Sequence, residues 1–198
     1  MTEMTETSTN AAPSFRAPGE GQAVSFLGNH MTIKATASST GGEFGLVESL
    51  IAPGFSPPLH VHHREDESFW VLEGELSMRC GDRTFRASAG SFVFLPRDVP
   101  HTFVVEGGRP ARMLTLLTPG GGEGVFVEGG RPAEHNGFPP ATPPDIEQLK
   151  RVTERYGAEI VGPPMQPTRR SSSVLSARLE GARSGAQESL ERLLEIRR

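Results

Sequence analysis

The sequence predicts an all-β protein, a barrel or a sandwich of short strands, followed by one α-helix. Between residues 23 and 119, short apolar runs alternate with turns rich in glycine and proline, which is typical of antiparallel sheet. The 23 glycines and 17 prolines separate these runs without forming a repeat. The length of 198 residues favours one domain with a well-buried core.

Seven stretches carry the predicted strands, one of them a hairpin. Four of them are simple runs of apolar and β-branched residues, at 24–27, 31–36, 44–51 and 111–117. Two others are longer blocks, 54–74 and 90–105, and each reads as strand, turn, strand. Between the blocks, residues 75–86 predict a β-hairpin that turns at residues 80–83.

One helix is predicted after the strands, at about residues 143–156. Residues 142–145 supply a polar cap with proline in the first turn. The apolar positions that follow at helical spacing are Ile146, Leu149, Val152 and Tyr156. We expect residues 158–161 to dock beside the helix and end the domain. Two roles are open for the helix, namely covering a cavity mouth and plain packing.

The predicted folded region, residues 21–164, lies between two tails. Residues 1–20 are polar and rich in Ser and Thr, which predicts a disordered N-terminal tail. Residues 165–198 are rich in Ser, Arg and Gly and predict a flexible tail. Leucines and one isoleucine at 190–196 indicate at most a short terminal helix, which could serve oligomer contacts.

The charge balance and the cysteine count exclude several classes of partner. A formal net charge of -4 and a pI of about 5.9 give no attraction to nucleic acid or an anionic membrane. The N-terminus lacks the basic and apolar regions of a signal peptide. Cys80 is the only cysteine, which excludes an intramolecular disulfide and fits a reducing compartment. We therefore expect a cytoplasmic protein without membrane or nucleic-acid partners.

The first block contains three candidate metal ligands. On an extended strand His60 and His62 project to the same face, while Val61 and His63 project to the other. The polar residues after them suit a turn, after which Glu67 can return to the histidines from a neighbouring strand. Imidazoles with one carboxylate suit a divalent transition metal better than calcium or magnesium.

The second block adds a fourth candidate ligand, His101. It follows a proline-bounded bend and shares a strand face with Phe103 and Val105. A histidine among apolar residues is more typical of a packed core than of a metal site. The three candidate ligands of the first block nevertheless make His101 a candidate for the fourth.

Other residues have simpler interpretations. We expect His63 on the outer face or at a subunit contact, and His30 and His135 in solvent. Glu65 is an alternative to Glu67 as the carboxylate ligand. The phenylalanines at 69, 92, 94 and 103 are interpreted as barrel core, and the glycine-rich residues 120–124 as a linker rather than a phosphate loop.

The first block resembles the first motif of the cupin family. Gly54, His60, His62, Glu67 and Gly74 fit the spacing of that motif at every position. The second block matches the second cupin motif at Gly90, Pro96 and His101. It departs from that motif at Asp98, where a turn glycine is usual, and at Val105, where an asparagine is usual. Neither departure removes a ligand, and aspartate tolerates unusual turn conformations.

Within the cupins, roughly residues 22–164 are similar to single-domain bacterial proteins of the quercetin 2,3-dioxygenase type. The resemblance implies a jelly-roll barrel, a homodimer, and a metal held by His60, His62, Glu67 and His101. It also implies that Glu67 acts as a base, if its pKa is raised by the cavity. The flavonol reaction would then run through loss of the 3-hydroxyl proton, attack by dioxygen, ring cleavage and release of carbon monoxide.

Several alternatives stay open at this point. The ligand set fits Fe, Mn, Ni, Co or Cu, with Zn as a further candidate, because affinity order and cellular supply together select the ion. The substrate is a flavonol-like or other enolisable aromatic molecule if O₂ is consumed. A metal cupin that isomerises or cyclises a small molecule without oxygen is the second reading, and a non-catalytic binding cupin is the third.

Overall fold

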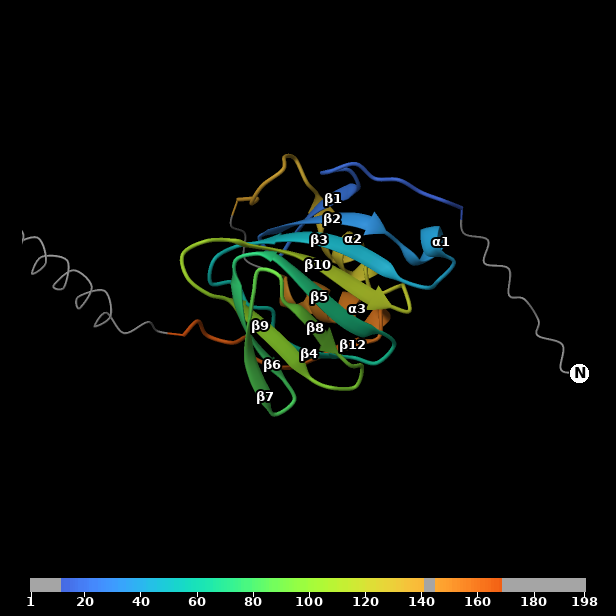
Figure 1. Cartoon of the computed structure of the whole chain (residues 1–198). Helices are drawn as coiled ribbons and strands as arrows, with labels where there is room; N and C mark the ends of the chain where they lie inside the picture. Colours follow the sequence, from blue (N-terminus) through green and yellow to red (C-terminus); the bar gives the residue numbers. More distant parts are fainter. Residues whose placement is uncertain (1–11, 141–144, 169–198) are drawn as a thin grey trace, which may run out of the picture. The chain divides into compact units, whose positions relative to one another are not determined.

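Two facing β-sheets form most of the described part of the protein, and the predicted all-β barrel with a C-terminal helix is confirmed (Figure 1). The computed structural model describes residues 12–140 and 145–168. By its contacts the chain divides into residues 1–167 and residues 168–198. The second unit lies almost wholly outside the described residues, as do residues 1–11 and 141–144.

The larger sheet has seven strands in the order β11-β1-β2-β3-β10-β5-β8, all paired antiparallel. Its strands are β1 (Gln22–Phe26), β2 (Asn29–Ala35), β3 (Gly45–Ile51), β5 (Asp66–Glu73), β8 (Phe92–Leu95), β10 (Ala111–Thr118) and β11 (Arg131–Pro132). The four simple runs predicted from the sequence are thus β1, β2, β3 and β10.

The smaller sheet has five strands in the order β12-β4-β9-β6-β7. Its strands are β4 (Leu59–His62), β6 (Glu75–Cys80), β7 (Arg83–Ser88), β9 (His101–Val105) and β12 (Ala158–Gly162). The predicted hairpin is β6 and β7, which pair from Glu75 with Ser88 to Cys80 with Arg83. The segment expected to dock after the helix is β12, which pairs with β4.

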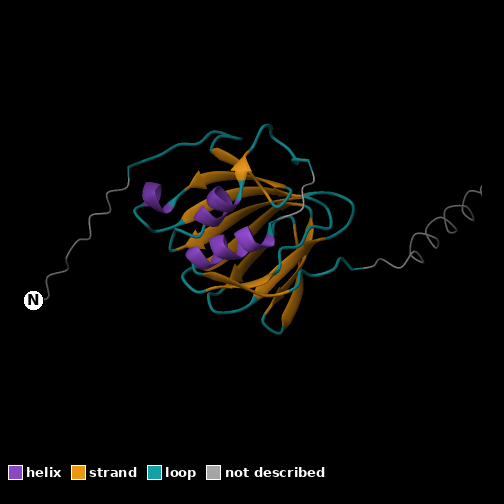
Figure 2. Ribbon diagram, turned by 180° about the vertical axis from the view of Figure 1, so that it is seen from behind, coloured by secondary structure: helices purple, strands orange, loops and turns teal. Residues whose placement is uncertain are grey.

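In the described part of the chain three helices accompany the sheets: α1 (Ala37–Thr40), α2 (Gly124–Gly129) and α3 (Ile146–Arg155). Seen from behind, α2 and α3 lie beside each other across the side where the sheets diverge (Figure 2). The predicted helix is α3, which starts after the N-cap Asp145, whose side chain accepts from Gln148 N. The predicted proline turn at 143–144 lies outside the described residues. No helix among the described residues is long and apolar enough to span a membrane.

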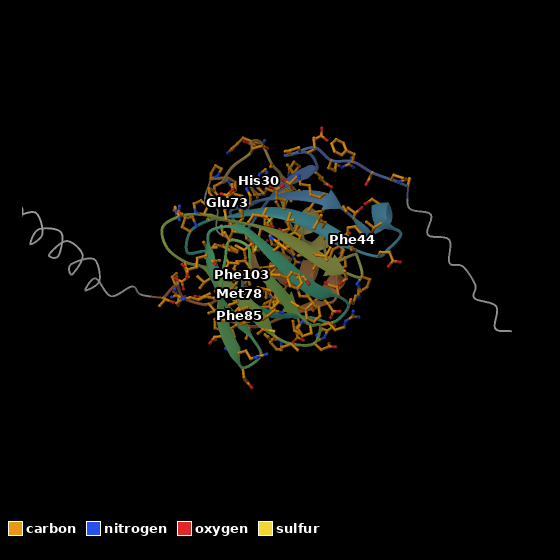
Figure 3. The ribbon with its side chains drawn as sticks, in the orientation of Figure 1. His30, Phe44, Glu73, Met78, Phe85 and Phe103 are labelled. Carbon is orange, nitrogen blue, oxygen red and sulfur yellow. The ribbon has the colours of Figure 1, made fainter. Side chains whose placement is uncertain are left out.

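The apolar core fills the space between the two sheets. Val47 and Val71 from the larger sheet, and Leu76 and Met78 from the smaller one, are fully buried. Met78 pairs with Phe103 across β6 and β9, and Figure 3 shows the two side chains next to each other. Each such buried apolar side chain stabilises the fold by roughly 1.5–3 kcal/mol.

The aromatic side chains of β8 correct one prediction. Phe69 and Phe103 are buried as expected, but Phe92 is 60% and Phe94 55% exposed. Phe92 pairs with Trp70, which also faces outward. The inner face of β8 is occupied by Val93 and Leu95, so the alternation of the strand turns both phenylalanines to the outside.

Candidate metal centre

Three histidines come together on the smaller sheet because of strand pairing. His60 and His62 lie on β4, two residues apart and therefore on one face. His101 is the first residue of β9 and pairs directly with His60. The three imidazole rings lie with centroids 4.6 to 5.4 Å apart.

Glu67 approaches the histidines from the opposite sheet. It lies on β5, which pairs with β10 and β8 in the larger sheet, whereas β4 pairs with β9 and β12. The expectation that Glu67 returns on a strand beside β4 is therefore wrong. Residues 63–65 form a crossing between sheets rather than a hairpin, and Glu67 points across the barrel interior.

The four predicted ligands lie in one cluster. The candidate ligand atoms of His60, His62, Glu67 and His101 all lie within 4.8 Å of one another. The Oε2 atom of Glu67 is 2.9 Å from His101 Nε2 and 3.8 Å from His62 Nε2. Bonds of about 2.1 Å to one ion place ligand atoms about 3 to 4 Å apart, so the cluster is close to the size of a mononuclear site.

Hydrogen bonds orient the imidazoles with Nε2 toward the cluster. His60 Nδ1 is 2.8 Å from the carbonyl oxygen of Pro58, and His101 Nδ1 is 3.1 Å from that of Val99. A carbonyl oxygen can only accept, so Nδ1 carries the proton and donates it in both residues. The lone pair of each neutral ring is then on Nε2, as metal coordination requires.

Glu65 gives His62 a different support. Its Oε1 atom is 2.7 Å from His62 Nδ1, and the side chain is buried. Glu65 is the alternative carboxylate ligand that the sequence offers, but its carboxylate lies behind His62 and not in the cluster of candidate ligand atoms. Its role as an orienting partner was missed from the sequence, although its place three residues after His62 was a usable signal.

The donor set fits a metal ion. His62 Nε2 is buried and has no hydrogen-bond partner among the described residues. His101 faces two acceptors, Val99 O and Glu67, while its neutral ring has only one proton to donate. Three nitrogen lone pairs and one carboxylate therefore face each other, and a cation bound between them would satisfy all four.

The cluster shifts the pKa of its members. Burial, together with the nearby His101, lowers the pKa of His60 from 6.5 to about 4. Burial alone would raise the pKa of Glu67, but the hydrogen bond to His101 and the three imidazoles outweigh it and lower that pKa to about 2. The condition set for Glu67 as a base, a pKa raised by the cavity, is therefore not met, because the imidazoles outweigh the effect of burial.

For His62 the effects oppose each other. Burial disfavours its charged form, but the hydrogen bond to Glu65 and the nearby Glu67 prevail and raise its pKa. A neutral His60 and an ionised Glu67 are the protonation states that bind metal at neutral pH.

A cavity of about 110 Å³ adjoins the cluster inside the barrel. His60, His62 and Glu67 form part of its wall. Val125 and Phe126 of α2, with Leu149 and Thr153 of α3, line it as well. The two helices thus contribute to the wall of the cavity, as the covering role proposed for α3 requires.

The remaining candidates lie apart from the cluster. His63 is exposed, as predicted, and its Nδ1 lies 2.7 Å from Asp98 Oδ1. Asp98 has a φ of 62°, so it adopts the turn conformation for which the motif usually has glycine. His135 is exposed as expected, but His30 is buried, because β2 lies between β1 and β3 in the larger sheet.

The chain resembles several known proteins. Residues 47–117 match the model of the cupin domain. Quercetin 2,3-dioxygenase of Bacillus subtilis is 26% identical over 143 residues, which are 72% of this chain and 42% of that protein. Polyketide synthase CurC of Streptomyces cyaneus is 32% identical over 84 residues, 42% of this chain and 53% of that protein. This chain thus spans about half the length of either relative.

Among solved structures, an RmlC-like cupin from Shewanella frigidimarina aligns with a TM-score of 0.46 and 20% identity, covering 55% of this chain and 92% of the other. The domain match covers β3 to β10 and contains all four clustered side chains. Residues 47–117 are therefore a cupin domain.

Proposed function

We propose that this protein is a metal-dependent enzyme that cleaves an enolisable aromatic molecule with O₂, both oxygen atoms entering the products. The observation that carries the proposal is that the ligand cluster meets the adjoining cavity, because His60, His62 and Glu67 belong to both. The similarity to Quercetin 2,3-dioxygenase supports the same class of reaction.

His60, His62, Glu67 and His101 would hold the ion, which supplies a Lewis acid and sites for oxygen ligands. Glu67 is given a second role as the base. Its Oε2 atom faces His101 and His62, so the proposal assigns the proton of the substrate hydroxyl to Oε1. The low pKa of Glu67 keeps this carboxylate ionised at neutral pH but makes it a weak base, so its transfer role would require a substrate hydroxyl made acidic by the bound ion.

The apolar side chains around the cavity would exclude water from the reacting molecule. His60 and His101, fixed by backbone carbonyls, would keep the cluster in place during turnover.

A second function is an oxygen-independent rearrangement or cyclisation of a small enolisable molecule. Polyketide synthase CurC, which is 32% identical over 84 residues, is named for synthesis rather than for a reaction with oxygen, and that name supports this candidate. Both functions use the same cluster and cavity, and they differ in whether O₂ is consumed.

Oxygen consumption by metal-loaded protein separates the two. Protein reconstituted separately with Fe, Mn, Co and Ni is mixed with flavonols and with single-ring enols, and O₂ uptake is recorded with an electrode. We expect uptake that depends on metal and is lost in His62→Ala. His63→Ala is the matched control, because His63 is the adjacent histidine and faces solvent.

Uptake that persists in His62→Ala would contradict the proposed site. No uptake by fully loaded protein, together with product formation under nitrogen, would favour the oxygen-independent function.

A further inference from the structure

We propose that the cavity binds a compact, mostly apolar molecule of one ring. Its enolised hydroxyketone oxygens would face the cluster of metal-ligand side chains, and one further hydrogen-bonding group would face Thr115. This inference rests on the proposed function and names its substrate class. Two independent observations carry it, the size of the cavity and the placement of hydroxyl groups in its wall.

The volume of the cavity matches a molecule of about one ring. The cavity measures about 110 Å³, and an engineered protein cavity of about 150 Å³ binds benzene. A three-ring flavonol exceeds this volume, so it would have to extend through the open side of the cavity or displace the wall. Much of that wall consists of buried core side chains such as Ile51, Phe69 and Met113, which pack at interior density and resist displacement.

The chemistry of the wall excludes a molecule with hydroxyls on every side. Away from the ligand cluster, the wall is made mainly of apolar side chains, among them Met31, Ile51, Phe55, Phe103, Leu117 and Ile160. A hydroxyl buried against them without a partner costs about 1–3 kcal/mol. A polyhydroxylated ligand would lose this amount several times over.

Two hydroxyls interrupt the apolar wall. Ser49 and Thr115 are buried, line the cavity, and make no side-chain hydrogen bond within the described part of the chain. The third hydroxyl of the wall, Thr153, instead donates within α3 to the carbonyl oxygens of Leu149 and Lys150. Ser49 and Thr115 are therefore available to a ligand.

The strand register places the hydroxyls of Ser49 and Thr115 in line with Glu67 of the ligand cluster. Glu67 pairs with Leu117, two residues from Thr115 on β10. Thr115 pairs in turn with Val47, two residues from Ser49 on β3. Diagonal neighbours on a sheet are about 7–8 Å apart, so one ring with an oxygen at each end spans from Glu67 to Thr115.

Calorimetric titration of Zn²⁺-loaded protein tests the inference with three probes. Tropolone is a single-ring enolised ketone, 5-hydroxytropolone adds a hydroxyl opposite its oxygens, and quercetin has three rings and several hydroxyls. We expect tropolone to bind, and quercetin to bind roughly a hundredfold more weakly. The added hydroxyl should tighten binding roughly fivefold, the effect of one net hydrogen bond.

The variant Thr115→Val keeps the shape of the side chain and should abolish that fivefold advantage. Ser68→Ala is the control, because Ser68 is a buried serine of the same sheet that lies outside the cavity wall. Thermal melts and zinc content, measured for every variant before and after titration, separate lost contacts from misfolding or loss of metal.

Quercetin binding as tightly as tropolone, or in its place, would overturn this inference and leave the proposed function intact. An undiminished advantage of 5-hydroxytropolone in Thr115→Val would overturn the role of Thr115. Failure of all three probes to bind protein that retains its zinc would contradict the proposed function as well.

Discussion

Glu65 is buried behind His62, and its carboxylate lies 2.7 Å from the imidazole Nδ1. His60 and His101 have neutral carbonyl oxygens in the same position. A carboxylate holds the ring more firmly and makes Nε2 a stronger donor. Gly122 leaves room for this side chain, because a Cβ there would lie 2.4 Å from Glu65 Oε1.

Replacing Glu65 should weaken metal binding without removing a ligand. We expect Glu65→Ala to lower the affinity for Zn²⁺ or Co²⁺ roughly 10- to 100-fold, since orienting partners of metal-binding histidines have effects of that size. The metal affinity of Glu65→Gln should lie between those of Glu65→Ala and the wild type, because the amide oxygen of glutamine can still accept a hydrogen bond from His62 Nδ1. Competition with a chromophoric chelator measures the affinity.

The control is Glu159→Gln, which removes the exposed carboxylate beside His63. Equal metal affinity of Glu65→Ala and the wild type would show that the bond from His62 to Glu65 does not support the site.

Single residues were predictable from the sequence where a motif fixed their spacing. The clustering of His60, His62, Glu67 and His101 followed from two such motifs. No motif marked Ser49 and Thr115, because their position in the cavity wall depends on which face of the sheet meets the cavity. The burial of His30 was also missed, since it depends on the strands to either side of β2.

At the scale of elements, α3 forms part of the wall of the cavity beside the ligand cluster. Leu149 and Thr153 are one turn apart and face the cavity, while Ile146 in the same helix is 47% exposed. The helix is therefore both a packing element and part of the cavity wall.

Shortening Leu149 should loosen the fold and enlarge the cavity. For Leu149→Ala we expect a loss of about 2–4 kcal/mol in the free energy of unfolding, the usual cost of such a truncation in a core. Binding of 3-hydroxyflavone should improve relative to tropolone, because the wall recedes. Urea denaturation and calorimetry measure the two effects.

Ile146→Ala is the matched control and should change the stability by less than about 0.5 kcal/mol. If Leu149→Ala left the ligand preference unchanged, α3 would be a packing helix without influence on the cavity.

The predicted elements were those with strong local patterns. The simple strand runs, the 75–86 hairpin and α3 all appear, with bounds shifted by a few residues. The helix α2 was missed because it begins and ends with glycine, a poor helix former. Tertiary contact stabilises it instead, including an edge-to-face contact of Phe126 with Phe26 at 5.3 Å.

At the scale of the whole molecule, the metal-free protein should lose stability in acid. The pKa of His60 is about 4 in the folded state and 6.5 as its ordinary value. Below pH 6.5 the unfolded chain takes up a proton that folded His60 does not, so stability falls between pH 6.5 and 4. Glu67, lowered from 4.5 to about 2, extends the loss between pH 4.5 and 2.

Urea denaturation in the presence of a chelator, at pH 7, 5.5 and 4.5, measures this loss, which should be on the order of 3 kcal/mol for His60. The raised pKa of His62 acts in the opposite sense, mainly above pH 6.5, so it offsets part of the change between pH 7 and 5.5 and leaves the change between pH 5.5 and 4.5 almost unaltered. His60→Gln should flatten the dependence on pH, and an unchanged slope in that variant would contradict the assignment.

The crossing between the sheets at residues 63–65 also bears on how the protein acquires its ion. His60, His62 and Glu67 lie within a stretch of eight residues, while His101 follows Glu67 by 34 positions. An unfolded or partly synthesised chain therefore already presents three ligands close together. An ion captured at that stage would complete its shell when β9 pairs with β4, and such early capture would make the metal stabilise the native state less than its affinity suggests.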